Sequence, residues 1–234
     1  MDFVVFQVDD KFWVIEQNGV RCFLFEGDEY SLLVDSAYEG DLRGVCRNLT
    51  GKPIKLLLTH GDRDHVGCAE QFDEIYAHPS EFVRISSREG GPVDLLPAWE
   101  RDIFDLGIFR FETVLIPGHT PGCIALLETN RRFLLAGDCV QVGPIYMFGP
   151  GRNMEAFRVS LEKLNRLRPR YDTIYSSHNL LEVDPPVIDE LEDFAGDICQ
   201  SRFPVPELAP EKLPKNVRTF SKGRVSFYLE LPEI

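Results

Sequence analysis

The segment Leu58–Cys68, with the sequence LTHGDRDHVGC, concentrates metal-binding side chains at one point of the chain. It places two histidines and two aspartates between His60 and His65, although the whole chain of 234 residues contains only five histidines. The apolar run Ile54–Leu58 just before these side chains predicts a fully buried strand. Side chains that converge at the end of a strand in this way suit one or two divalent metal ions.

Three further candidate ligands also follow predicted strands. They are His119, Asp138 and His178, which come after the apolar segments Phe111–Ile116, Phe133–Ala136 and Thr173–Ser176. Four strand ends therefore bring potential ligands to one region. The full predicted set is His60, Asp62, Asp64, His65, His119, Asp138 and His178.

The rest of the chain predicts a β-rich start followed by alternating strands and helices. Turn signals separate the first predicted strands, which are Phe3–Val8, Phe12–Glu16, Arg21–Phe25 and Ser31–Val34. Helices are predicted at Gly40–Leu49, Glu81–Ser86, Met154–Leu167 and Pro186–Cys199, further strands at Ile75–Ala77 and Cys123–Glu128, and a closing hairpin at Val217–Phe220 and Arg224–Leu229. Because no linker or repeat interrupts this pattern, we expect one domain over residues 1–234.

Composition narrows the classes of partner. A net charge of −13 argues against nucleic acid and anionic membrane as partners, because both attract basic surfaces. No apolar run approaches the roughly 20 residues that span a bilayer, and the N-terminus lacks a secretory signal pattern. We therefore expect a cytoplasmic protein, monomeric or homodimeric, that acts on a small-molecule substrate. The six cysteines lack close pairs, so we expect reduced thiols and no disulfide.

With its ligands in this order, the sequence resembles the metallo-β-lactamase superfamily. The signature of that family is a THxHxDHxG loop, then a Gly-His-Thr segment, a Gly-Asp segment and a final histidine. The matching segments here are Thr59–Gly67, Pro117–Gly122, Gly137–Asp138 and His178. The resemblance implies an α+β fold, a four-layer αβ/βα sandwich in which two mixed β-sheets are flanked by helices. It also implies a binuclear metal site at one edge of the sandwich.

The resemblance further implies how the ligands divide between two ions. His60, Asp62 and His119 would hold the first ion, Asp64, His65 and His178 the second, and Asp138 would bridge both. Divalent ions lower the pKa of bound water toward neutrality, so a bridging hydroxide is the expected nucleophile. Asp64 is the predicted catalytic residue, which orients this hydroxide and passes its proton to the leaving group.

Asp62 departs from the family pattern, because most members have a second histidine at this position. A carboxylate oxygen makes the first site harder and more anionic than an imidazole nitrogen does. We therefore expect two divalent ions, with zinc first and iron or manganese as alternatives; a single ion per chain is a further alternative. Flavodiiron proteins and some choline-phosphate esterases also resemble this chain in having a carboxylate here.

Together these features predict a metal-dependent hydrolase that cleaves a small ester, thioester or lactone, similar to the glyoxalase-II-like branch. A phosphodiesterase or choline-phosphate esterase is one alternative, and a di-iron oxidoreductase that needs a separate electron donor is another. Only about 56 residues follow His178, and the last of them predict strands, so the helical glutathione-binding domain of that branch is not expected.

Two Gly/Pro-rich segments, residues 84–101 and 140–152, are predicted as loops that could border the substrate pocket. Tyr146 and Arg152 are the predicted substrate-binding residues. Trp99 and Phe148 fit substrate contact or local packing equally well. We expect a structural role for the remaining histidine, His78.

Overall fold

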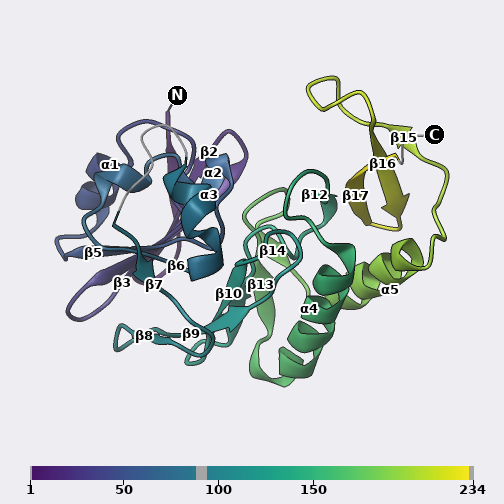
Figure 1. Ribbon diagram of the computed structural model, residues 1–234. Helices are drawn as coiled ribbons and strands as arrows, with labels where there is room; N and C mark the ends of the chain where they lie inside the picture. The colour runs from purple at the N-terminus through teal and green to yellow at the C-terminus, as the bar shows by residue number, and fades with distance from the viewer. Residues whose placement is uncertain (1, 88–93, 232–234) are drawn as a thin grey trace.

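The computed structural model of the chain describes residues 2–87 and 94–231, and a seven-stranded mixed sheet forms its N-terminal part (Figure 1). The strand order is β1-β2-β3-β4-β5-β6-β7. Strands β1 to β4 pair antiparallel, whereas β4 to β7 pair parallel. The bounds are β1 Val4–Asp9, β2 Phe12–Gln17, β3 Val20–Glu26, β4 Ser31–Val34, β5 Ile54–Leu57, β6 Ile75–Ala77 and β7 Leu96–Pro97.

A second mixed sheet has six strands in the order β14-β13-β11-β10-β9-β8. Its pairs are antiparallel except for β11 and β13, which run parallel. The bounds are β8 Ile103–Asp105, β9 Arg110–Leu115, β10 Ile124–Glu128, β11 Phe133–Leu135, β13 Thr173–Tyr175 and β14 Glu182–Val183.

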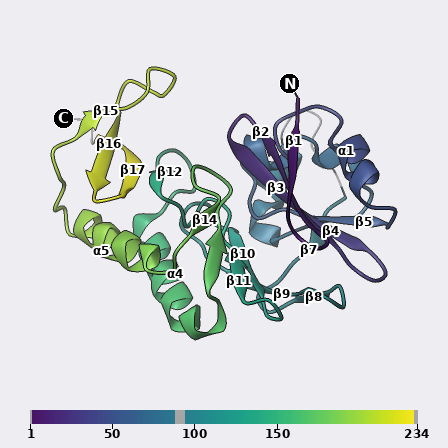
Figure 2. The same ribbon diagram turned by 180° about the vertical axis from the view of Figure 1, so that it is seen from behind.

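Helices cover the outer faces of these two sheets (Figures 1 and 2). Helices α1 Leu42–Leu49, α2 Arg63–Val66 and α3 Phe82–Ser86 lie beside the first sheet, and α4 Met154–Leu167 and α5 Val187–Cys199 lie beside the second. Short 3-10 turns occupy η1 Ala69–Gln71, η2 Pro79–Glu81 and η3 Arg168–Arg170. The predicted four-layer αβ/βα sandwich is therefore confirmed.

The alternation of side chains along the central strands explains why these layers form. Val14 on β2 and Phe23 on β3 point into the core between the two sheets, whereas their neighbours Ile15 and Cys22 join the core beneath α1. Since both faces of these strands are largely buried, most of their residues are apolar, as is typical of a sheet covered on both sides.

A third sheet of four strands was not predicted. Its order is β12-β17-β16-β15, with bounds β12 Gly143–Tyr146, β15 Glu207–Leu208, β16 Val217–Lys222 and β17 Val225–Glu230. The closing hairpin is confirmed as β16 and β17. The prediction of a loop over residues 140–152 is wrong in part, because β12 pairs in parallel with β17. Likewise β7 interrupts the loop predicted over residues 84–101, of which residues 88–93 lie outside the described part.

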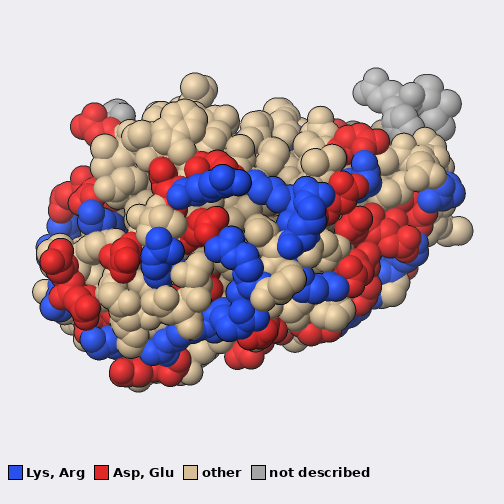
Figure 3. Space-filling view, turned by 90° about the horizontal axis from the view of Figure 1, so that it is seen from below, with Lys and Arg blue, Asp and Glu red and all other residues tan. Residues whose placement is uncertain are grey.

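The face of the molecule seen from below carries charges of both signs (Figure 3). Figure 3 shows Lys and Arg side chains interspersed with Asp and Glu on one face of the molecule. Within the described residues no helix is both long and apolar enough to cross a bilayer. The six cysteines are free thiols.

Candidate metal centre

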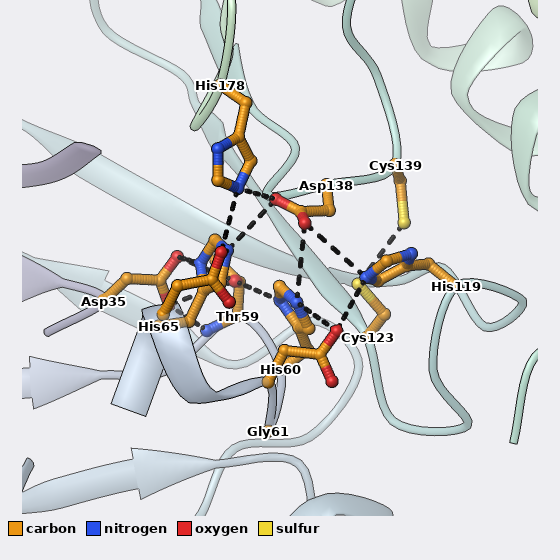
Figure 4. Close-up of polar contacts among 12 residues, drawn as sticks. Asp35, Thr59, His60, Gly61, His65, His119, Cys123, Asp138, Cys139 and His178 are labelled. Carbon is orange, nitrogen blue, oxygen red and sulfur yellow. Dashed lines mark hydrogen bonds and ion pairs between the residues drawn. The ribbon is translucent and has the colours of Figure 1, made fainter. Parts of the chain in front are cut away.

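All seven predicted ligands meet at the ends of strands from both large sheets. His60 and Asp62 follow β5, and the short helix α2 carries Asp64 and His65. The other three, His119, Asp138 and His178, follow β9, β11 and β13 of the second sheet. Figure 4 shows the imidazole rings of the histidines directed toward the carboxylate of Asp138.

The first group of ligand atoms contains Nε2 of His60, Nε2 of His119 and one carboxylate oxygen each from Asp62 and Asp138. Asp62 Oδ2 lies 3.6 Å from His60 Nε2 and 3.3 Å from His119 Nε2. Asp138 Oδ2 lies 3.9 Å from His60 Nε2 and 3.6 Å from His119 Nε2. Ligand atoms of His60, His119 and Asp138 all lie within 4.8 Å of one another, which is close enough for one ion.

The second group joins Asp64, His65 and His178, whose ligand atoms also lie within 4.8 Å of one another. Asp64 Oδ2 is 3.3 Å from His178 Nε2 and 3.8 Å from His65 Nε2. The other oxygen of Asp138, Oδ1, is 3.1 Å from His65 Nε2 and 3.2 Å from His178 Nε2. The two oxygens of Asp138 thus face the two groups, which is the arrangement a bridging carboxylate requires.

The unpaired nitrogen atoms in this region fit a metal ion. The buried Nε2 atoms of His60, His65 and His119 have no hydrogen-bond partner among the described residues. In three of the histidines the other ring nitrogen, Nδ1, makes a hydrogen bond. The partners are Thr59 Oγ1 for His60 (3.0 Å), Asp35 Oδ2 for His65 (2.7 Å) and the Gly19 carbonyl for His178 (2.9 Å). Buried polar atoms normally have a partner, and fixing one ring nitrogen aims the other at a metal.

The charges of the site also fit metal binding. Burial lowers the pKa of His178, but the carboxylates of Asp138 and Asp64 outweigh it and raise that pKa to about 10. Burial likewise raises the pKa of Asp138, but His178 and His65 hold it well below its usual value. The carboxylates thus favour protonated, positively charged imidazoles. A bound divalent ion would supply this positive charge in place of the protons, and the imidazole rings would then be neutral.

Two buried acids that support the ligands were not identified from the sequence. Asp35, which follows β4, accepts hydrogen bonds from the backbone N–H of Thr59 (2.8 Å) and from the Thr59 hydroxyl. Glu81 accepts hydrogen bonds from the backbone N–H groups of Gly61 (2.8 Å) and Gly122 (2.7 Å) and so joins the two ligand loops. Asp35 carries the same signal as the ligands, an acid directly after a predicted strand.

Asp62 has cationic neighbours as well as histidines. The guanidinium of Arg152 contacts Asp62 Oδ2, and Arg84 Nη1 lies 3.8 Å from Asp62 Oδ1. Only 9% of the Arg152 side chain is exposed. Burial raises the pKa of Asp62, but His119 and His60 outweigh it and hold that pKa below its usual range. The carboxylate is therefore ionised and shared between the ligand group and Arg152.

A cavity of about 420 Å³ opens onto the ligands. Its wall includes Asp62, Asp64, Asp138 and His178 together with Tyr38, Arg63, Tyr146, Lys212 and Tyr228. The predicted substrate-binding residue Tyr146 thus lies beside the ligands.

The remaining candidates lie elsewhere. Trp99 is 52% exposed and packs edge-on against the ring of His78 at 5.5 Å between centroids. His78 Nδ1 accepts a hydrogen bond from the Ser80 backbone at the start of η2, which is a structural role. The ring of Phe148 is tilted against that of Tyr146, with 5.7 Å between the ring centroids, and Phe148 lines a separate cavity.

Curated relatives share part of the sequence. An uncharacterised protein, YobT of Bacillus subtilis, is 29% identical over 53% of this chain and 63% of its own length. The acyl-coenzyme A thioesterase MBLAC2 of Bos taurus is 24% identical over 69% of this chain and 75% of its own length. The hydroxyacylglutathione hydrolase of Bdellovibrio bacteriovorus is 29% identical over 70% of this chain and 64% of its own length. The chain thus spans just under two thirds of two of these relatives.

Solved structures share the fold. A metallo-β-lactamase from Pontibacter korlensis superposes with a TM-score of 0.69 at 15% identity, over 84% of this chain and 100% of that chain. The protein TTHA1623, in a di-iron-bound form, superposes with a TM-score of 0.60 at 23% identity, over 75% of this chain and 94% of that chain.

The family resemblance is confirmed by a match of residues 16–178 to the sequence model of the Metallo-beta-lactamase superfamily. The matched region begins in β2 and ends at the last candidate ligand, His178. It therefore contains all seven residues that meet in the metal centre. The chain belongs to the metallo-β-lactamase superfamily.

Proposed function

We propose that this protein is a metal-dependent hydrolase that cleaves a small ester, thioester or lactone at a binuclear site. The observation that carries the proposal is the position of Asp138, whose two oxygens each face a separate group of ligands at the cavity wall. A site of this kind holds two ions close to one substrate bond.

The chain's own residues would hold the ions as follows. His60, Asp62 and His119 form the first site, Asp64, His65 and His178 the second, and Asp138 bridges them. When bound, two divalent ions supply Lewis acidity, which lowers the pKa of water toward neutrality and polarises a carbonyl oxygen. Zinc is the expected metal, and the carboxylate of Asp62 keeps iron and manganese as alternatives.

Asp64 and Tyr146 have the roles closest to the substrate. Asp64 is a ligand that also lines the cavity, so its carboxylate can accept a proton from the attacking water and pass it to the leaving group. Tyr146 lines the same cavity, and burial is the main reason that its pKa is raised to about 12. It therefore keeps its proton at neutral pH and can donate a hydrogen bond to substrate.

Two relatives support a thioester or a related ester as substrate. The names of the bovine and Bdellovibrio proteins describe hydrolysis of acyl-coenzyme A and of an acylated glutathione. Both substrates are thioesters. The 420 Å³ cavity is large enough for a small molecule, so a small-molecule substrate remains part of the proposal.

A second candidate is a phosphodiesterase or choline-phosphate esterase. Arg63 and Lys212 lie in the wall of the cavity beside the acidic ligands, and two cations there favour a substrate that carries phosphate. A di-iron oxidoreductase with a separate electron donor is the third, and the carboxylate at Asp62 is the feature that supports it.

Metal analysis of the purified protein, followed by activity assays, tests these alternatives. Plasma mass spectrometry measures zinc, iron and manganese per chain, and panels of esters, thioesters, lactones and phosphodiesters are then assayed before and after chelation. We expect close to two ions per chain and chelator-sensitive hydrolysis of a carbonyl substrate. A fully loaded protein that hydrolyses none of these carbonyl substrates would contradict the proposal, and activity toward phosphodiesters alone would favour the second candidate.

Variants assign the residues. His119→Ala is expected to lose metal and activity together, whereas Asp64→Asn is expected to lower kcat more than metal content. His78→Ala is the matched control, because it removes a histidine outside the two ligand groups. Equal activity of all three variants and the wild-type protein would contradict the assignment.

A further inference from the structure

A second cavity, of about 550 Å³, lies between the third sheet and the C-terminal end of α5. Its wall is mainly aliphatic and aromatic, and six of the side chains that form it are Met147, Phe148, Ile198, Phe203, Phe220 and Leu229. Apolar cavities of this size are typical of sites that bury an apolar ligand. None of the proposed metal ligands belongs to the described wall of this cavity.

The two cavities share a wall made by strands β12 and β17. Tyr146 pairs with Tyr228, and both line the cavity at the metal centre. The next residues along each chain segment, Met147 and Leu229, line the apolar cavity. Because successive side chains of a strand point to opposite faces, this one pair of strands separates the metal centre from the apolar cavity.

Arg152, in the segment that follows β12, reaches from the apolar cavity to the metal centre. It belongs to the wall of the apolar cavity, and its guanidinium contacts Asp62 in the metal centre. The Nε and Nη1 atoms of Arg152 are buried and lack hydrogen-bond partners in the described parts of the chain. The other charged residue of the wall, Glu230, is exposed. The cavity is therefore apolar, with a single buried cation at the side nearest the metal centre.

We propose that this cavity binds the linear aliphatic chain of an acyl substrate, with the acyl carbonyl next to Arg152 and the metal centre. The inference rests on the proposed hydrolase function and adds a substrate class to it, esters or thioesters of medium-chain carboxylic acids. The apolar wall buries the chain, and the guanidinium of Arg152 attracts the oxygen atoms of the acyl group and then of the carboxylate product.

A series of 4-nitrophenyl esters from acetyl to decanoyl tests the proposal, because the leaving group is constant and only the chain changes. We expect kcat/KM to rise by about fourfold for each methylene that enters the cavity, and then to level off when the cavity is full. A kcat/KM that stays constant or falls with chain length, in a protein that does hydrolyse the acetyl ester, would overturn the inference and leave the proposed function intact.

Filling the cavity gives a second test. Leu229→Trp is expected to shorten the chain length at which kcat/KM levels off. Val159→Trp is the matched control, because Val159 is 50% exposed on α4, outside the described wall of the cavity. If Leu229→Trp does not fold, the smaller change Ile198→Phe is used instead. The same chain-length profile in the cavity variant and the control would overturn the inference.

Binding of decanoate provides a measurement that does not depend on hydrolysis. We expect calorimetry to show decanoate binding at least about tenfold more tightly than decanol, because one charge-assisted hydrogen bond to Arg152 distinguishes the two. Leu229→Trp is expected to weaken both ligands. If every ester, thioester and lactone of the panels is inert, the proposed function is wrong, and the decanoate titration alone decides the inference: no binding, or equal binding to Leu229→Trp, overturns it.

Discussion

Replacing Asp35 by Asn is expected to weaken metal binding although Asp35 itself touches no metal. Asp35 is fully buried, and its Oδ2 atom lies 2.7 Å from Nδ1 of His65. A His65 ring that binds metal through Nε2 carries its proton on Nδ1 and donates it to this carboxylate. An amide NH₂ group in place of Oδ2 cannot accept that proton, so the ring would move its proton to Nε2 and lose its lone pair for the metal.

The size of the effect follows from the contacts that remain. The Asn oxygen can still accept the hydrogen bonds from the backbone N–H and the hydroxyl of Thr59, which now lie 2.8 and 3.0 Å from Oδ1 of Asp35. The loss is therefore one charge-assisted hydrogen bond and the preferred tautomer of His65. Loss of such a supporting partner reduces metal affinity by about 10–100-fold, or about 1.4–2.7 kcal/mol.

Competition with a chromophoric chelator measures the zinc affinity of the demetallated proteins. Glu128→Gln is the matched control, because Glu128 is also a fully buried acid that accepts backbone hydrogen bonds, at the far end of β10 from the ligands. We expect a loss of zinc affinity in Asp35→Asn and none in Glu128→Gln. Wild-type zinc affinity in Asp35→Asn would refute the reasoning, and an equal loss in both variants would show a general effect of removing buried charge.

Three further outcomes are expected. Chelation should lower the midpoint of thermal unfolding by roughly 5–10 °C relative to protein with free metal at about 100 times its Kd, measured by scanning calorimetry; an unchanged midpoint would contradict metal binding by the folded chain. Glu81→Gln should lower the free energy of unfolding in urea by about 1–3 kcal/mol, because Gly61 and Gly122 lose a charged acceptor; an unchanged value would show that the amide replaces the carboxylate fully. Asp62→His should raise the ratio of zinc to iron bound, and it should lower the free energy of unfolding by about 1–3 kcal/mol because Arg152 loses its partner. Adding Arg152→Met to the same chain should restore this free energy; no rescue in the double variant would show that the pair is not coupled.

The ligand set and most of the elements could be predicted from the sequence because both depend on local patterns. Helix Met154–Leu167 and strands Ser31–Val34 and Ile75–Ala77 have the predicted bounds, since their apolar spacing and flanking turn residues are local signals. The ligands were found because their residue types gather within a few residues of the ends of predicted strands. Helix α2, inside the motif, was not predicted, because four residues provide no periodicity to recognise.

The features that escaped prediction depend on distant partners. Strand β12 has a proline and a glycine in four residues and is a strand because β17, about 80 residues later in the sequence, pairs with it. Asp35 follows a predicted strand as the ligands do, but that position alone does not single it out, and its role depends on His65, which the fold brings against it. In both cases the deciding contact is tertiary, so a local pattern does not contain it.

The aspartate at position 62 and the arginine at position 152 are best understood as one feature. A neutral histidine at position 62 would leave the buried guanidinium of Arg152 without its anionic partner, which is costly in an interior of low dielectric. Conversely, an apolar residue at position 152 would leave the charge of Asp62 to the histidines, a bound metal and the more distant Arg84. Because Arg152 also lines the apolar cavity, the exchange of histidine for aspartate in the motif links the metal centre to the surface on which we place the acyl chain. We therefore expect the departure from the family motif to affect substrate recognition as well as metal preference.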